Sequence, residues 1–175
     1  MKIDLQKAIK ILKNDGVGVI PTDTLYGLVG SAFSKKAIGR IYKIKNRNKK
    51  KKLIVLISSV KDLERFKIKI NKEQAKILKK FWPGEVSIIL KGIAFRVPKK
   101  KMLLELLKKT GPLVAPSANK EGEEPARNIK EAKIYFSDSV DFYLSGGVLK
   151  SEPSTLVRFD KDKLIVLRQG KVIIK

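Results

Sequence analysis

The sequence contains no cysteine and no histidine among its 175 residues. The lack of cysteine excludes a disulfide framework, a thiol nucleophile and a thiolate metal site. The lack of histidine excludes a Ser-His triad, an imidazole general base and a histidine-ligated zinc. Any chemistry must therefore depend on lysine, arginine, hydroxyl groups, carboxylates and backbone amides.

Long apolar stretches are also missing. The longest unbroken run covers residues 53–57, whereas a transmembrane helix needs about 20 apolar residues. The first residues mix lysine with apolar side chains and show neither the apolar core nor the cleavage site of a signal peptide. We therefore expect a cytoplasmic protein with no membrane segment.

Acidic residues are scarce relative to basic ones: 17 aspartates and glutamates stand against 40 lysines and arginines, for a formal net charge of +23. A field of this size attracts polyanions such as nucleic acids and nucleotides. Only seven of the basic residues are arginine, however, and a composition rich in lysine and isoleucine also arises from genome-wide bias. The charge by itself leaves both explanations open.

The hydrophobic pattern predicts one domain over residues 1–175, long enough to bury roughly two-thirds of its unfolded surface. Helical spacing of apolar residues recurs over residues 5–12, 34–42, 59–66, 71–81, 102–109 and 128–136. Short apolar runs typical of strands cover residues 17–20, 53–57, 86–90, 93–97, 113–115, 142–144, 156–159 and 164–167. Because strands and helices alternate early and antiparallel pairs dominate late, we expect an α/β fold with a mixed parallel and antiparallel sheet.

Three polar clusters follow expected strands or helices, near the strand ends where α/β folds place their sites. They consist of Thr22, Asp23, Thr24 and Tyr26; of Lys45, Arg47 and the lysines at 49–52; and of Ser117, Asn119 and Arg127. Lys45 lies on the apolar face of the second helix, one turn after the apolar residues and at the end of the helix, so its side chain is predicted to point inward, toward a cleft. Hydroxyl and amide groups can orient a small polar ligand, while lysine and arginine neutralise phosphates.

This set of groups suits phosphoryl or nucleotidyl transfer, which requires mainly positioning and positive charge from the protein. The chain has neither a P-loop nor a Gly-x-Gly-x-x-Gly fingerprint after a strand. Each cluster taken alone is also compatible with ordinary structure. Residues 21–28 could be a turn whose Asp and Thr accept backbone amides, and residues 49–52 could be a solvated lysine run. Trp82 is predicted to be a packing residue.

Together and in this order, the segments resemble the YrdC family of threonylcarbamoyl-adenylate synthases. The similar segments are residues 21–28, 41–47, 53–59, 81–90, 95–98, 111–119, 146–157 and 167–170. Lys45-x-Arg47 followed by Ser117-x-Asn119 matches the signature pairing of the family. The resemblance implies a twisted mixed sheet flanked by helices with a basic concave cleft, in the short single-domain form of the family.

The resemblance also implies an activity, that of a nucleotidyltransferase joining L-threonine, bicarbonate and ATP into threonylcarbamoyl-AMP with release of pyrophosphate. A threonylcarbamoyl transferase complex would then pass the threonylcarbamoyl group to tRNA. ATP would be a substrate, with Mg²⁺ held mainly by its triphosphate and no metal site in the protein itself. Direct contact with tRNA stays open.

The same resemblance implies roles for individual residues. Lys45 and Arg47 would be catalytic. The nucleotide would contact Arg47, Lys51, Ser87, Asn119, Arg127 and Ser154. Threonine would contact Thr24, Lys91 and Ser117.

The chain departs from the family pattern at four positions. Asn48 and Lys52 replace prolines, and Leu56 replaces a histidine expected near the substrate amino acid. Glu121 replaces a serine. Loss of the prolines is expected to loosen the basic stretch that contains them.

Two other functions are alternatives to the synthase. The first is a non-catalytic, basic RNA-binding module, which the net charge suggests. The second is a carbamoyl-adenylate-forming domain that uses carbamoyl phosphate, as in hydrogenase-maturation carbamoyltransferases. The chain lacks the accessory zinc-finger and acylphosphatase-like regions of those enzymes, which favours the synthase.

Overall fold

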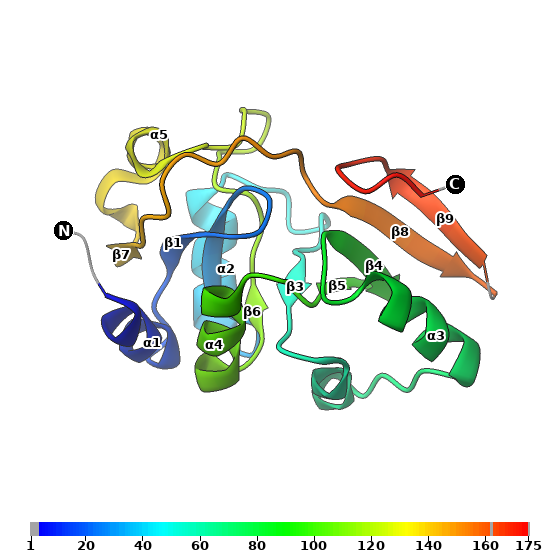
Figure 1. Cartoon of the computed structure of the whole chain (residues 1–175). Helices are drawn as coiled ribbons and strands as arrows, with labels where there is room; N and C mark the ends of the chain where they lie inside the picture. The colour runs from blue at the N-terminus through cyan, green and yellow to red at the C-terminus, as the bar shows by residue number, and fades with distance from the viewer. Residues whose placement is uncertain (1–3, 162, 175) are drawn as a thin grey trace.

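The computed structural model describes residues 4–161 and 163–174 (Figure 1). Its helices are α1 (Leu5–Lys13), α2 (Lys35–Ile44), α3 (Lys72–Phe81), α4 (Lys101–Thr110) and α5 (Ile129–Phe136), with the 3-10 helices η1 (Val60–Phe66) and η2 (Ser137–Ser139). Its strands are β1 (Gly18–Pro21), β2 (Tyr26–Ser31), β3 (Val55–Leu56), β4 (Val86–Leu90), β5 (Ile93–Arg96), β6 (Leu113–Val114), β7 (Phe142–Tyr143), β8 (Thr155–Asp160) and β9 (Lys163–Arg168). None of the helices within these ranges combines the length and apolar character needed to cross a membrane.

Within the described part of the chain, a nine-stranded sheet runs in the order β7-β1-β2-β6-β3-β5-β4-β8-β9. Three neighbouring pairs are parallel, namely β1 with β7, β3 with β5 and β4 with β8. The other neighbours are antiparallel, including the β8–β9 pair near the end of the chain. The mixed sheet confirms the α/β fold class predicted from the order of the sequence patterns.

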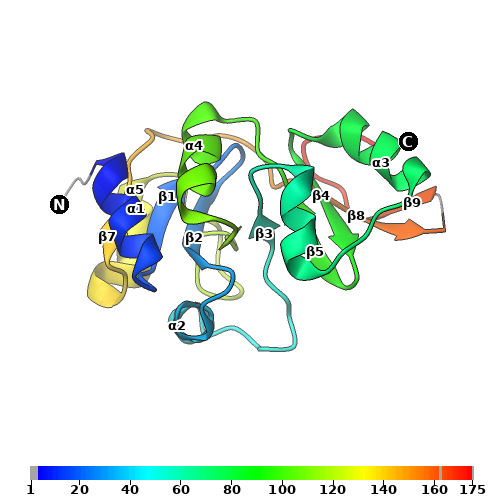
Figure 2. The ribbon, with the colours of Figure 1, turned by 90° about the horizontal axis from the view of Figure 1, so that it is seen from below.

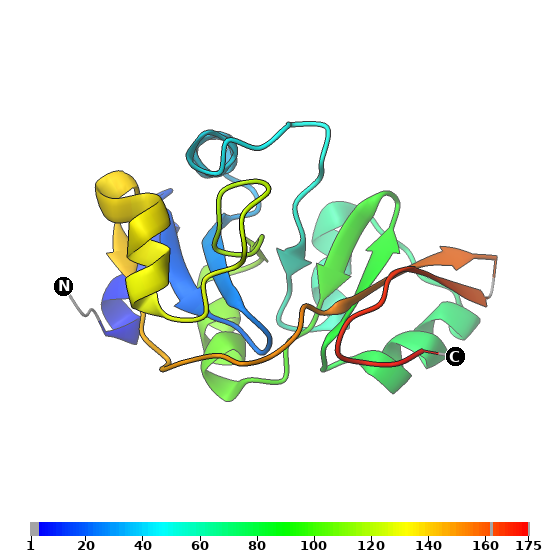
Figure 3. The ribbon, with the colours of Figure 1, turned by 90° about the horizontal axis from the view of Figure 1, so that it is seen from above.

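Helices cover both faces of the sheet around β1 and β2. α1 and α4 lie side by side on one face, and α2 and α5 lie on the other (Figures 2 and 3). The first pair buries an apolar cluster with the sheet that includes Ala8, Ile9, Leu12, Leu103, Leu106 and Leu107. The second pair contributes to a larger cluster, which continues into η1 and α3 and includes Ala37, Ile41, Leu63, Leu78, Ala132 and Phe136. The two apolar layers therefore cover the faces of the sheet, and the polar clusters lie near the ends of its strands.

Local sequence signals explain where several elements begin and end. The Ser34 hydroxyl accepts a hydrogen bond from the backbone amide three residues further on (3.0 Å), which satisfies a donor that the first turn of α2 leaves unpaired. Asn71 and Gln74 form a reciprocal capping box at the start of α3. Trp82 is buried at the end of α3, and its indole N–H donates to the Val86 carbonyl (2.7 Å). The prediction that Trp82 is a packing residue is thereby confirmed.

The turn expected over residues 21–28 is shorter in the structure. Pro21 pairs with Tyr26 in the antiparallel ladder between β1 and β2, and the Thr22 amide donates to the Leu25 carbonyl (3.1 Å) to close the turn. The prediction was wrong from Tyr26 onward because β2 is buried on both faces, so its sequence lacks the alternation of a half-exposed strand. The hydroxyl-bearing residues therefore lie at the tip of a hairpin.

The strand expected over residues 53–57 is limited to Val55–Leu56, between β5 and β6. Single hydrogen bonds continue on either side of it, from the Ala115 amide to the Ile54 carbonyl (2.8 Å) and from the Ile57 amide to the Arg96 carbonyl (3.0 Å). The apolar run therefore marks a segment bonded to both neighbours, although its regular ladder is short. Residues 59–66 were expected to be helical, and residues 60–66 form a 3-10 helix.

Residues 145–154, here called the crossover segment, join β7 to β8, which lie toward opposite ends of the sheet (Figures 1 and 3). Tyr26 fixes the start of this segment, because its phenol donates to the Gly147 carbonyl (2.7 Å) and accepts from the Gly146 amide (2.9 Å). A Cβ atom at Gly146 would lie 2.6 Å from the Pro21 side chain, so this close approach requires glycine. The crossover segment is thus held against the β1–β2 hairpin.

Candidate active site

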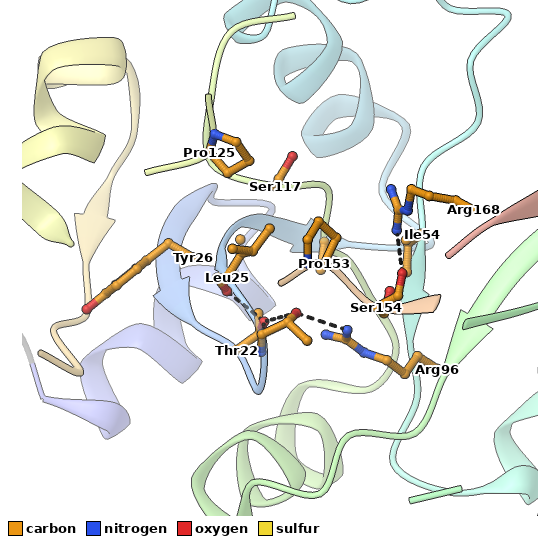
Figure 4. A pocket seen from close by; sticks show the side chains of 13 residues that line it. Thr22, Leu25, Tyr26, Ile54, Arg96, Ser117, Pro125, Pro153, Ser154 and Arg168 are labelled. Atoms are coloured by element: carbon orange, nitrogen blue, oxygen red, sulfur yellow. Dashed lines mark hydrogen bonds between the residues drawn. The ribbon is translucent and has the colours of Figure 1, made fainter. Parts of the chain in front are cut away.

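A small pocket lies between the tip of the β1–β2 hairpin, β5 and the end of the crossover segment (Figure 4). Its volume is about 140 Å³, well below the roughly 300–1,000 Å³ of pockets for drug-sized ligands. Hydroxyls, two arginines and apolar side chains line it, from Thr22, Thr24, Leu25, Tyr26, Gly27, Ile54, Arg96, Ala115, Ser117, Pro125, Pro153, Ser154 and Arg168. The volume and the polar groups suit a small polar metabolite.

Two members of the first polar cluster, Asp23 and Tyr26, form hydrogen bonds to other segments of the fold. The Asp23 carboxylate accepts the backbone amides of Lys99 (2.8 Å) and Lys100 (2.9 Å), just before α4. Tyr26 anchors the crossover segment through its phenol. The other two hydroxyls of the cluster line the pocket: that of Thr22, which donates to the Leu25 carbonyl (2.6 Å), and that of Thr24.

Arg96, from β5, brings a buried cation to the pocket. Only 4% of the residue is exposed, and its Nη1 donates to the Thr24 hydroxyl (3.2 Å). Its Nε has no hydrogen-bond partner, and no ion pair among the described residues joins the guanidinium to a carboxylate. Burial lowers the pKa of Arg96, because a cation removed from water is unfavourable until an anion accompanies it. A guanidinium has several N–H donors, so Arg96 retains donors for an anion beside the one that it gives to Thr24.

Ser154 and Arg168 form another wall of the pocket (Figure 4). Arg168 Nη2 donates to the Ser154 carbonyl (2.8 Å), and burial lowers the pKa of Arg168. The Ser154 hydroxyl lies 2.9 Å from the hydroxyl of Ser87, which is fully buried and is not a lining residue. The structure thus brings Ser154 to the pocket and places Ser87 behind it.

Lys45, at the end of α2, is buried as predicted, with 1% of the residue exposed. Its ammonium donates to the backbone carbonyls of Ser117 (2.6 Å) and Asn119 (2.5 Å). Burial, together with the nearby charge of Arg47, lowers the pKa of Lys45 to about 8. The Ser117 hydroxyl donates to the Asn119 side-chain oxygen (2.6 Å). Lys45 therefore holds the Ser117–Asn119 turn from behind, while Ser117 faces the pocket.

Residues 46–52, here called the basic loop, leave the end of α2. Arg47 Nε donates to the Lys51 carbonyl (3.2 Å), and its Nη2 lies 3.5 Å from the Lys52 carbonyl. Glu121 accepts the Asn48 amide (3.0 Å) and forms an ion pair with Lys51. These two contacts lower the pKa of the Glu121 carboxyl. Glu121 therefore supplies an anchor for the loop, which offsets the loosening expected from the missing prolines.

Two predicted site residues, Lys91 and Arg127, do not line the pocket, and neither does Leu56, which replaces the histidine of the family pattern. Lys91 occupies the turn between β4 and β5, and its ammonium donates to the Lys67 carbonyl (3.1 Å), so the structure does not bring it to the pocket. Arg127 is exposed just before α5 and is not a lining residue. Leu56 lies in the apolar core, and Ile54 is the residue of this segment that lines the pocket.

Arg96 and Arg168 line the pocket but were not predicted from the sequence. A signal was present, because the chain has 33 lysines and only seven arginines. An arginine inside the apolar stretch 93–97 indicates a need for the planar, multiply donating guanidinium that lysine cannot supply.

Comparison with known proteins places the chain in a family. The family model Sua5/YciO/YrdC, described as "Telomere recombination", matches residues 10–170. A protein of Methanocaldococcus jannaschii is 31% identical, over 97% of this chain and 89% of its own length. The threonylcarbamoyl-AMP synthase of Hahella chejuensis is 30% identical, over 81% of this chain and 85% of its own length.

A solved structure shows the same fold. Sua5 of P. abyssi, complexed with L-threonine, is similar to this chain with a TM-score of 0.87 at 25% sequence identity. The similarity covers 97% of this chain and 56% of that one, so this chain spans little more than half the length of that relative. The family model and the sequence relatives together show that the chain belongs to the Sua5/YciO/YrdC family.

Proposed function

We propose that this protein is a threonylcarbamoyl-AMP synthase that uses ATP, L-threonine and bicarbonate. The observation that carries the proposal is the buried Arg96 guanidinium at a small pocket, which donates to the Thr24 hydroxyl through Nη1 and forms no ion pair among the described residues. The basic loop is joined to the wall of this pocket through Lys45, which holds the turn at Ser117. The name of the Hahella chejuensis relative and the L-threonine bound to P. abyssi Sua5 support the same assignment.

The pocket is assigned to threonine. In this proposal the carboxylate of threonine pairs with Arg96, because a buried guanidinium without an anion gains most from a charge-assisted hydrogen bond. Thr22 and Thr24 offer hydroxyls to the polar groups of the substrate, and Ser117 faces the carbamate. Arg96 takes the place that the resemblance implied for Lys91.

The nucleotide is assigned to the basic loop and the neighbouring turn. Arg47 and Lys51 bind the phosphates, while Asn119 and Ser154 contact the rest of the nucleotide. Lys45 is assigned a positioning role rather than direct catalysis, because its ammonium is occupied by the two carbonyls of the turn. Its charge adds to the positive field around the phosphates.

These assignments suit the following reaction. The threonine nitrogen attacks the carbon of bicarbonate and water leaves, which gives a carbamate. A carbamate oxygen then attacks the α-phosphorus of ATP, the bond from that phosphorus to the bridging oxygen breaks, and pyrophosphate leaves. Arg47 and Lys51 stabilise the charge that grows on the leaving group. Magnesium enters as part of the nucleotide substrate, since a triphosphate binds it with few protein carboxylates.

The product is a mixed anhydride of a carbamate and a phosphate, so it is an activated donor of the threonylcarbamoyl group. We assign its use to a separate transferase complex that modifies tRNA, in the cytoplasm. Direct contact between this chain and tRNA is a further part of the proposal, supported by the net charge of +23.

Pyrophosphate release tests the proposed function. Purified protein with magnesium and ATP should release pyrophosphate only when both L-threonine and bicarbonate are present, and Arg47→Ala should reduce turnover about 100-fold. Absence of threonine-dependent release would reject the proposal. Release that requires carbamoyl phosphate instead would identify the carbamoyltransferase alternative.

A non-catalytic RNA-binding module is the second candidate, favoured by the exposed lysines of residues 49–52. It predicts RNA binding that weakens steeply with salt and needs no ATP. Neutral substitutions at these four positions should then weaken RNA binding. Unchanged binding by that variant would count against the module.

A further inference from the structure

Glu121 lies among the cations that the proposed function assigns to phosphate. Its carboxylate accepts the Asn48 amide (3.0 Å) and pairs with the Lys51 ammonium. No other ion pair among the described residues involves the basic loop. A backbone N–H and an ammonium that converge on one anion are also the donors with which proteins bind phosphate oxygens. Glu121 therefore occupies a small anion site.

The remaining phosphate donor of the loop is also occupied by the chain itself. The Arg47 guanidinium donates to the Lys51 carbonyl and approaches the Lys52 carbonyl, at 3.2 and 3.5 Å. A triphosphate that takes these same donors must replace some of these contacts. Glu121 is the one negatively charged group in these contacts, so its displacement depends most on the charge of the incoming ligand.

The position of Glu121 is fixed by its backbone, whereas its side chain can be reached from solvent. Its amide donates to the Lys45 carbonyl (2.9 Å), which ties it to the start of the basic loop. Its side chain is 24% exposed, and that of Lys51 is 61% exposed. A ligand can therefore approach the ion pair without opening the core.

We propose that Glu121 is a specificity-determining residue that competes with phosphates for the basic loop, so that only a highly charged polyphosphate displaces it. This inference rests on the proposed function, which assigns Arg47 and Lys51 to phosphates. Inorganic phosphate gains little by replacing one carboxylate, whereas a triphosphate brings more charge and more acceptor oxygens. Glu121 thereby favours ATP over AMP and inorganic phosphate. Because the pKa of Glu121 is lowered, the competitor keeps its charge at neutral pH.

Calorimetric titration with inorganic triphosphate and with inorganic phosphate tests the inference. The proteins to compare are the wild type, Glu121→Gln and the matched control Glu124→Gln. Glu124→Gln makes the same change in net charge as Glu121→Gln. Glu124 is exposed in the same loop and forms no ion pair among the described residues, so its substitution removes no contact with the basic loop. Glu121→Gln should bind inorganic phosphate about three- to fivefold more tightly, with a smaller gain for triphosphate. Glu124→Gln should match the wild type within about twofold.

The outcomes separate this inference from the proposed function. Equal or weaker phosphate binding by Glu121→Gln would overturn the competitor role. Arg47→Ala then identifies what has failed: if it also leaves triphosphate binding unchanged, the assignment of the basic loop to phosphates is wrong. If Arg47→Ala loses triphosphate binding and Glu121→Gln gains nothing, only the competitor role is wrong.

A nuclear magnetic resonance titration tests displacement without a substitution. In the free protein, the Asn48 amide signal should shift as acid protonates Glu121, because that amide donates to the carboxylate. Saturating triphosphate should abolish the dependence of this signal on Glu121 protonation. An Asn48 signal that follows Glu121 equally with and without triphosphate would show that the carboxylate stays in place and would overturn the inference.

Discussion

The pocket and the basic loop carry positive charge in opposite ways. In the pocket, Arg96 is buried and no carboxylate among the described residues forms an ion pair with it. In the loop, Lys51 is exposed and Glu121 pairs with it. A buried cation without a counter-ion gains strongly from one well-placed anion, whereas exposed cations contribute small, additive and salt-screened terms. The difference separates recognition of a small amino acid from recognition of a polyphosphate.

The largest expected effect comes from removing the buried charge. Arg96→Met should reduce kcat/KM for threonine at least about 100-fold, because it deletes the proposed carboxylate partner. The free energy of unfolding should stay unchanged or rise by up to about 2 kcal/mol, since a buried charge without a partner is replaced by an apolar chain. Threonine-dependent pyrophosphate release and urea denaturation provide the two measurements.

Arg158→Met is the matched control for Arg96→Met, because Arg158 is exposed on β8. It removes the same charge and should leave both activity and stability close to those of the wild type. If Arg96→Met loses so much stability that unfolding accounts for its loss of activity, Arg96 has a mainly structural role instead.

Lys45 joins the two regions, and its substitution should have the next largest effect. Lys45→Met removes the donor to two carbonyls of the Ser117–Asn119 turn and should cost about 1–3 kcal/mol of stability at pH 7. The pKa of Lys45 in the folded protein is about 8, below its ordinary 10.5. Between these values the unfolded chain binds more protons, so wild-type stability gains a contribution as the pH rises. The wild type should therefore gain about 1 kcal/mol per pH unit over Lys45→Met between pH 8 and 10.

Urea denaturation of both proteins at several pH values measures this difference. Parallel stability curves for the wild type and Lys45→Met over that range would mean that the Lys45 ammonium titrates normally. The contrast between buried and exposed cations would then rest on Arg96 alone.

The exposed loop should show smaller effects that are confined to the nucleotide. Lys51→Met should raise KM for ATP about fivefold and leave KM for threonine unchanged, because it removes one exposed charge from the phosphates. Lys49→Met, which changes the same charge two residues away, should alter neither constant by more than about twofold. Equal effects of the two substitutions would mean that the loop acts through its overall charge only.

The smallest expected effect concerns Ser87. Ser87→Ala should cost about 1 kcal/mol of stability by removing the hydrogen bond to Ser154, with KM for ATP changed less than about twofold. The nucleotide contact implied by the family resemblance predicts a larger rise in KM for ATP. Steady-state kinetics combined with thermal denaturation distinguishes the two roles.

Most of the fold could be predicted from the sequence because its determinants are local. Helical periodicity, the Ser34 cap and the Asn71–Gln74 capping box act within a few residues, and they define helices that the structure contains. The extent of β2 could not be predicted in this way, because a strand buried on both faces has no alternating pattern and is recognised only by its neighbours.

In the candidate site, too, the residues marked by short motifs could be predicted, whereas those that depend on contacts distant in sequence could not. Thr24 and Ser117 were identified from short motifs and Ser154 from the family resemblance, and all three line the pocket. Arg96 was missed because its role depends on the Thr24 hydroxyl, 72 residues away in sequence. The contact of Glu121 with Asn48 spans 73 residues and joins two positions that depart from the family pattern. Such compensation is visible only when both positions are placed in space.

The crossover segment also has a consequence for when binding becomes available during synthesis of the chain. The pocket needs Thr22 and Thr24 from the first hairpin, but Pro153, Ser154 and Arg168 are translated only after most of the described fold. Contacts between such distant parts of a chain form slowly, and only after the intervening segments are available. A nascent chain that ends before residue 153 can bury its first hairpin, but it cannot enclose a ligand. Ligand binding can therefore report that translation of the described fold is nearly complete.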